Sequence, residues 1–223
     1  IKKMLNKFLK TIHNKYSRIL KFIFFLRYLF ATFLISISLF LTIPIFFNYE
    51  NKVELIKNHL LENYDFEIND YKNIEYKAFP HPRLELKKAQ IKFLKSDTNF
   101  NVNNLRIYPK IFSIYNLSYF NVKKIIFEGN VANLKVPNFH VFIEQLSKQK
   151  KKLSFNDLNL KIKDDDKLIF RLENIFFSNF GHKKNSIKGR VFGKKFRAEL
   201  GDNLKSTKVK LSNSGINIEL DLD

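Results

Sequence analysis

The sequence predicts a membrane-anchored α+β protein that is mostly antiparallel β. One N-terminal transmembrane helix is expected to precede a curved β-sheet that forms an open groove and carries one or two short helices. Three observations lead there: an uncharged apolar run of twenty residues near the N-terminus, alternating hydrophobicity through most of the remaining chain, and 25 Phe among 223 residues. Alternation with period two is typical of strands with one apolar face.

Residues 1–27 form a basic segment with eight Lys or Arg and no acid. Apolar residues from Leu5 to Leu20 recur at helical spacing, which predicts an amphipathic helix lying on the anionic cytoplasmic leaflet, in contact with inner-membrane lipids. The basic residues expected at that surface are Lys7, Lys10, Lys15, Arg18, Lys21 and Arg27.

Residues 28–47, YLFATFLISISLFLTIPIFF, predict the transmembrane helix. A helix of this length covers roughly the 30 Å hydrocarbon core of a bilayer. A cleavable signal peptide would have a shorter apolar region and a small-x-small cleavage site, neither of which is found here. The one-sided basic flank predicts a cytoplasmic N-terminus and a periplasmic region over residues 49–223, in a single-pass protein of the bacterial inner membrane.

Beyond the span, residues 50–63 predict a short helix with a stripe formed by Val53, Ile56 and Leu60. About ten short strands follow, with a one-residue slip in phase between Leu86 and Ile91 that suggests a β-bulge. The pattern favours an antiparallel sheet over βαβ units. The alternating pairs or triplets begin at Ile74, Leu84, Ile91, Leu105, Ile125, Leu158, Phe170, Phe196, Val209 and Ile216.

A second helix is predicted to start at Asn138 as its N-cap and to run through Leu146. The basic run that follows, residues 148–152, is interpreted as a solvated helix end or linker, with phosphate binding as the alternative.

The sequence carries no recognisable catalytic or metal-binding motif. It has no Cys, five scattered His, and none of the HExxH, Walker, GxSxG or GxGxxG patterns. The acidic run 164–166 lacks the spacing of a calcium loop and is interpreted as a turn. The net charge of +19 accompanies a general excess of Lys, Asn, Ile and Phe, so we expect no nucleic-acid partner. We also expect neither an enzyme nor a cofactor.

Residues 78–91, AFPHPRLELKKAQI, follow the span and first helix and resemble the opening of AsmA-family envelope proteins, with their Pro-x-Pro strand entry. Residues 100–109 and 122–129 fit the next strands of that family, and residues 172–175 and 187–193 resemble its recurrent hairpins. The resemblance covers roughly residues 25–223. The basic N-terminal segment and the scarcity of Gly depart from the family pattern.

The resemblance implies an inner-membrane-anchored protein that shelters or transfers phospholipid and supports outer-membrane assembly and lipid homeostasis. Alternation alone favours ordinary core packing of the apolar face, and the resemblance favours a face that holds acyl chains instead. The residues expected to line this groove are Leu158, Leu160, Phe170, Leu172, Val191 and Leu211. Two alternatives remain: a single-span β-jellyroll component of lipopolysaccharide export, which predicts a closed two-sheet sandwich, and a non-enzymatic protein-interaction module.

Ten strands spaced by about 4.8 Å give a groove of about 50 Å, which is too short to cross a bacterial envelope. The sequence therefore predicts either a further stretch of the same β pattern beyond an incomplete domain, or a β-protein partner. That partner would add a strand at the C-terminal edge, around Ile216 to Leu222.

Overall fold

The computed structural model describes residues 2–116, 118–165, 167–182, 184, 186–200, 206–212 and 215–221. The chain divides into two compact units, residues 1–44 and 45–223. Each unit is described by itself.

The first unit is a single long helix, α1 (Lys2–Thr42), which merges the predicted basic helix with the predicted span. A 3-10 turn, η1 (Ile43–Phe46), follows at Pro44, which has no backbone N–H to donate to a hydrogen bond. The stretch Lys21–Phe46 has a mean hydropathy of 2.3 over its most apolar window and is long and apolar enough to cross a membrane. Within it, the hydroxyl groups of Thr32 and Thr42 donate to carbonyl oxygens of the preceding turn, so these polar side chains are compatible with an apolar surrounding.

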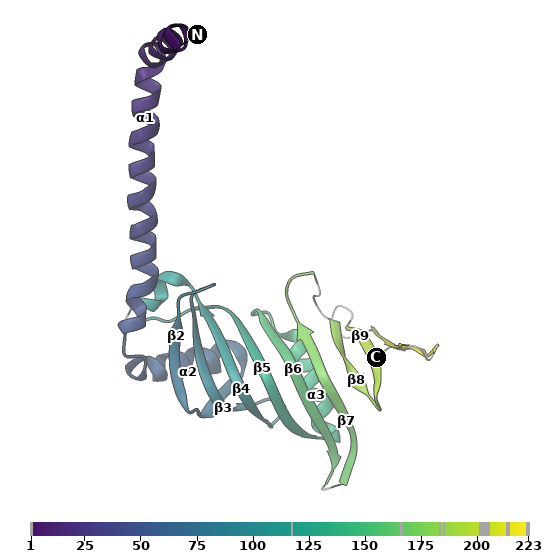
Figure 1. Ribbon diagram of the computed structural model, residues 1–223. Coiled ribbons are helices and arrows are strands. Elements are labelled where there is room, and N and C mark those ends of the chain that lie inside the picture. The colour runs from purple at the N-terminus through teal and green to yellow at the C-terminus, as the bar shows by residue number, and fades with distance from the viewer. Residues whose placement is uncertain are drawn as a thin grey trace. The chain divides into compact units, whose positions relative to one another are not determined.

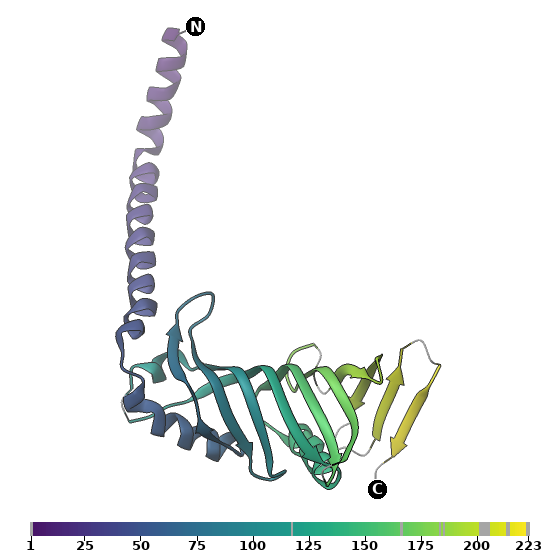
Figure 2. The same ribbon diagram turned by 60° about the horizontal axis from the view of Figure 1, so that its bottom comes forward.

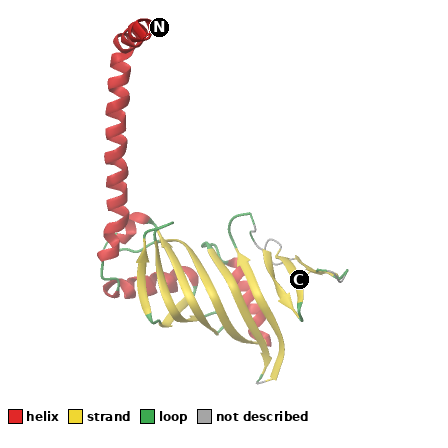
Figure 3. Ribbon diagram, in the orientation of Figure 1, coloured by secondary structure: helices red, strands yellow, loops and turns green. Residues whose placement is uncertain are grey.

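The second unit holds two short helices and eleven described strands, which form one open sheet (Figures 1 and 3). The helical elements are η2 (Glu50–Lys52), α2 (Val53–Tyr64), η3 (Ile111–Ile114) and α3 (Val136–Lys148). The first six strands are β1 (Phe66–Asp70), β2 (Asn73–Lys77), β3 (Arg83–Phe93), β4 (Thr98–Pro109), β5 (Val122–Lys135) and β6 (Leu153–Asp164). The remaining five are β7 (Lys167–Ser178), β8 (Ser186–Val191), β9 (Lys194–Leu200), β10 (Ser206–Leu211) and β11 (Asn217–Asp221).

The sheet follows chain order from β3 to β11, and both β1 and β2 pair with β3. Every pairing is antiparallel except that of β5 with β6, which are parallel and joined through α3. The prediction of a mostly antiparallel open sheet with few helices is confirmed. The single βαβ unit, β5–α3–β6, was not predicted, because alternation of inward and outward residues is the same in parallel and antiparallel strands.

Both α2 and α3 cover the same face of the sheet, as Figure 2 shows. The centre of the core, between these helices and the sheet, consists of six Phe rings. They come from β1, β3, β4, β5, α3 and β6. The members are Phe66, Phe93, Phe100, Phe127, Phe142 and Phe155. The rings of Phe127 and Phe155 stack with centroids 4.5 Å apart, and Phe142 brings α3 to within 5.3 Å of the Phe100 ring centroid.

The helix α3 starts earlier than the sequence predicted. Its N-cap is Lys135 in place of Asn138, and Pro137 lies within the first turn. Proline fits there because the first backbone N–H groups of a helix have no intrahelical acceptor.

A row of left-handed residues crosses the sheet and shifts the phase of successive strands. Lys88 in β3, Gly129 in β5, Asp157 in β6 and Asn174 in β7 have φ between 48° and 63°, at 50°, 62°, 57° and 49°. The apolar residues that pack in or against the core change parity at each of these positions: from Leu86 to Ala89 in β3, from Phe127 to Ala132 in β5, from Phe155 to Leu158 in β6 and from Leu172 to Ile175 in β7. The predicted slip in phase between Leu86 and Ile91 is found at Lys88, but it is not the suggested β-bulge, because β3 and β4 keep one pairing register across it, with Lys87 opposite Asn104 and Ala89 opposite Val102.

The opposite face of the sheet is polar. An ion-paired group crosses β3, β4 and β5, with Arg83 Nε 2.7 Å from Glu85 Oε1 and Arg106 Nη1 2.7 Å from Glu128 Oε1. Arg106 Nε also lies 3.4 Å from Glu85 Oε1. The two faces of the sheet therefore differ, one being polar and ion-paired and the other apolar.

Candidate functional site

The candidate site is an apolar groove between α3 and the inner face of strands β6 to β10. Its cavity has a volume of about 300 Å³. All seventeen residues that line it are hydrophobic. They are Phe139, Phe142, Ile143 and Leu146 of α3, Leu158 and Leu160 of β6, Phe170, Leu172, Ile175 and Phe177 of β7, Ile187 and Val191 of β8, Phe196, Ala198 and Leu200 of β9, and Val209 and Leu211 of β10.

The structure brings all six predicted groove residues together in this one cavity. They fall into two groups by burial. Leu158 and Leu160 retain only 1% and 2% of their exposure and form the floor beneath α3. The other four residues are half-buried and form the wall: Phe170, Leu172, Val191 and Leu211.

The helix α3 forms one side of the groove because its apolar residues recur three and four positions apart. Phe142 and Leu146 are buried in the core, whereas Phe139 and Ile143 are only partly buried and reach the groove. The ring of Phe139 meets that of Phe170 edge to face with centroids 6.4 Å apart, so helix and sheet are in contact across the groove.

The sheet face is less completely covered from β7 onward. Phe196 and Val209 line the groove and are half-buried, and Ile218 of β11, which pairs with Val209, is exposed. Apolar side chains left partly exposed along several neighbouring strands are typical of a surface that binds an apolar ligand or partner.

Comparison with known proteins finds no matching family model and no matching curated sequence.

The chemistry available in the groove is apolar contact alone, because none of its lining residues is charged or carries a polar side chain. Across the described residues, no group of three or more His, Asp or Glu side chains lies together in a way that could hold a metal ion. The arrangement suits a ligand segment made of hydrocarbon, with any polar headgroup left outside.

The sequence identified fewer than half of the groove residues. Phe139 and Ile143 were assigned to a helix without a role, and Ile187 was noted only as part of a family-like hairpin. The sequence of α3 does carry a signal for a second apolar surface, because it has more apolar residues than one buried stripe requires. Nothing in the sequence, however, says which strands α3 crosses.

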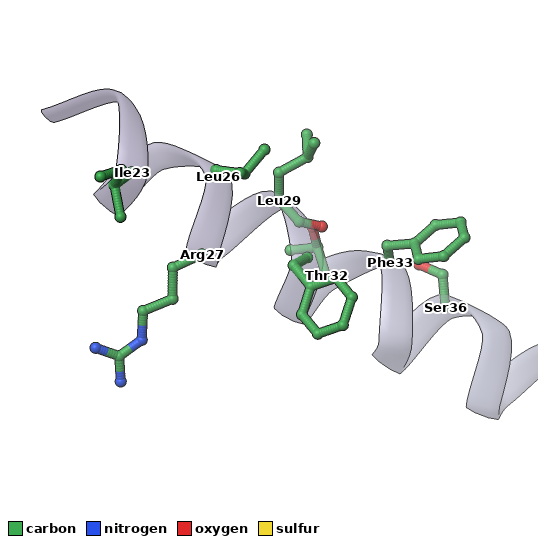
Figure 4. Close-up of a pocket in the computed structure, with 8 residues that line it drawn as sticks. Ile23, Leu26, Arg27, Leu29, Thr32, Phe33 and Ser36 are labelled. Carbon is green, nitrogen blue, oxygen red and sulfur yellow. The ribbon is translucent and has the colours of Figure 1, made fainter. Parts of the chain in front are cut away.

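The predicted membrane-surface residues lie on α1. Lys7, Lys10, Lys21 and Arg27 are exposed, while the side chains of Lys15 and Arg18 lie outside the described part of the structure. Figure 4 shows a hollow along α1 in which Arg27 is the one charged residue among eight. All eight lining residues come from this single helix, so the hollow is part of its apolar surface and not an enclosed site.

Proposed function

We propose that this chain is a single-pass protein of the bacterial inner membrane whose β domain lies in the periplasm and shelters phospholipid acyl chains. In this proposal it serves outer-membrane assembly and lipid homeostasis, as the AsmA resemblance implies. The basic segment before the apolar stretch of α1 supports the cytoplasmic position of the N-terminus.

The observation that carries the proposal is the groove under α3, lined by seventeen hydrophobic residues and continued by a half-exposed apolar sheet face. Leaving such a surface in water is unfavourable by about 25 cal/mol for each Å2 of apolar area, and acyl chains would remove that cost. The volume of about 300 Å³ favours a segment of one acyl chain over a whole lipid.

The alternative of a lipopolysaccharide-export jellyroll requires two sheets packed face to face. The described strands form one open sheet instead, which favours the bridge-like lipid carrier. A protein-interaction module would use the same apolar face, and the experiment below distinguishes the two.

The test places a photoreactive amino acid at Leu172 or at Glu173 of the full-length, membrane-embedded chain. These neighbours point to opposite faces of β7, so they sample the groove and the polar face at one level of the sheet. We expect phospholipid adducts, identified by mass spectrometry, from position 172 and few from position 173. Equal yields from both positions, or protein adducts alone from position 172, would contradict the proposal.

A second test introduces a charge into the groove, and the predicted groove residue Leu160 is unsuitable for it. Its side chain is buried, so a charge introduced there would lack a partner and unfold the domain regardless of lipid. Leu172→Glu leaves the new carboxylate at the groove wall, and we expect it to reduce co-purifying phospholipid while the domain stays folded.

A further inference from the structure

One end of the sheet concentrates positive charge. The described residues of segments 78–82, 109–124, 149–152 and 179–186 meet there, and we call these segments the basic edge. Strand register brings them together, since Pro109 pairs with Val122, Ile125 with Leu153, and Ser178 with Ser186. In sequence the basic edge contains eight Lys and no acid.

The opposite end of the same sheet has no such imbalance. Its segments, 94–97, 133–136, 164–167 and 191–194, contain four Lys and four Asp. A general excess of lysine in the chain would enrich both ends alike. The charge of the basic edge is therefore a property of that location and not of composition.

Four lysines of the basic edge gather around a surface cavity of about 550 Å³ with Tyr108 and Phe180. They are Lys110, Lys123, Lys124 and Lys152. The ammonium group of Lys124 lies 4.3 Å from the centroid of the Tyr108 ring. Partial burial lowers the pKa of Lys124, and the nearby charges of Lys123 and Lys152 lower it further. A bound anion would relieve this repulsion.

Large aromatic side chains project from the same end. Phe79 and Tyr119 are exposed, and Phe112 of η3 is exposed to 77%. Exposed aromatic rings beside lysines are the combination that proteins place at the boundary between lipid headgroups and acyl chains.

The basic edge contacts the segment that directly follows the apolar helix. Phe47 directly follows the stretch Lys21–Phe46, and its ring meets that of Tyr115 edge to face at 5.6 Å. The buried ammonium group of Lys52 donates to the carbonyl oxygens of Ile114 and Asn116. The segment leaving the apolar helix is thus attached to the β4–β5 connection, which belongs to the basic edge.

We propose that the basic edge rests on the anionic phospholipid surface of the membrane that α1 crosses. The lysines would contact lipid phosphates, and Phe112 and Tyr119 would enter the interfacial layer. This inference rests on the proposed membrane anchoring but is independent of lipid binding in the groove. It assigns the basic run at residues 150–152 to a membrane contact in place of a solvated linker.

The test uses the absence of Trp from the chain. Phe112→Trp reports on the basic edge, and Phe192→Trp is its control, because Phe192 is similarly exposed at 81% but lies in the β8–β9 turn at the opposite end. The full-length variants are reconstituted in nanodiscs of phosphatidylcholine with phosphatidylglycerol, with or without phospholipid brominated near the headgroup. We expect bromine quenching and blue-shifted emission for position 112 only.

Quenching at position 112 should be weaker in discs of phosphatidylcholine alone. In anionic discs, Lys110→Gln or Lys123→Gln should each lower the equilibrium constant for docking of the basic edge on the membrane about fivefold. Absence of quenching at position 112 in anionic discs, or equal quenching at position 192, would overturn the inference. Failure of the chain to co-purify with discs would overturn the anchoring and this inference with it. The first two results would leave lipid cross-linking at Leu172 unaffected, because that measurement reports on the groove.

Discussion

At the scale of single residues, the left-handed positions decide how the sheet bends. Gly129 is the tightest of them, since a Cβ atom there would lie 2.6 Å from Nδ2 of Asn103. Asp157 and Asn174 are of the residue types that adopt positive φ at modest cost, whereas Lys88 is not. The sequence revealed the slip at Lys88 through the change of parity, but the other three shifts were not predicted.

We predict that Gly129→Ala lowers the free energy of unfolding by about 1–3 kcal/mol, because it combines a strained φ with a steric clash. Thermal unfolding of the detergent-solubilised chain, followed by circular dichroism, measures this. Gly193→Ala is the matched control: its φ of 75° is equally left-handed, but its Cβ would have no atom within 4 Å. The exposed Asn103 allows a rescue, and Asn103→Ala should recover part of the loss in the Gly129→Ala background. Equal losses at Gly129 and Gly193, without rescue, would show that the clash contributes nothing.

At the scale of elements, the positions of the strands in the sequence were more predictable than which strands pair with one another. Leu84, Leu105, Ile125 and Leu158 were assigned inward by alternation, and all four are buried. The short strand β1 was missed, since its two apolar residues, Phe66 and Ile68, follow directly on a helix. The parallel pairing of β5 with β6 could not be predicted either, because it depends on where α3 packs and not on the strands themselves.

The helix α3 has a structural side and a groove side, which predicts unequal effects from two similar changes. Phe142→Ala removes a ring from the six-Phe core and should lower the free energy of unfolding by about 3–5 kcal/mol. Phe139→Ala removes a half-buried ring at the groove and should cost only about 1 kcal/mol. The same unfolding measurement compares them, and lipid cross-linking from position 172 should fall in the Phe139→Ala variant. Similar stability losses in both variants would mean that the groove side is ordinary core.

At the scale of the whole domain, the sheet has an open edge at β11. In the described part of the chain β11 pairs with β10 alone, and Ile216 and Ile218 beside it are exposed. The sheet is ten strands wide, because β1 and β2 both pair with β3, and at about 4.8 Å for each strand it extends for roughly 50 Å, which is shorter than an envelope. An unpaired edge with exposed apolar residues is suited to strand addition.

We predict that another β-strand pairs with β11 in the cell and extends the apolar face beyond it. A photoreactive residue at Asn217 should give a discrete protein adduct in intact cells, because a strand added at the edge would lie within about 5 Å of it. Glu75 in β2 is the control position, because β2 pairs with β3 at the other side of the sheet. The Glu75 carboxylate forms ion pairs with Lys77 and Lys87, so the surroundings of this position are polar. Adducts of equal yield from both positions would indicate random encounter. If position 217 gives no adduct while position 172 still captures lipid, the domain shelters acyl chains without handing them along a continuous sheet.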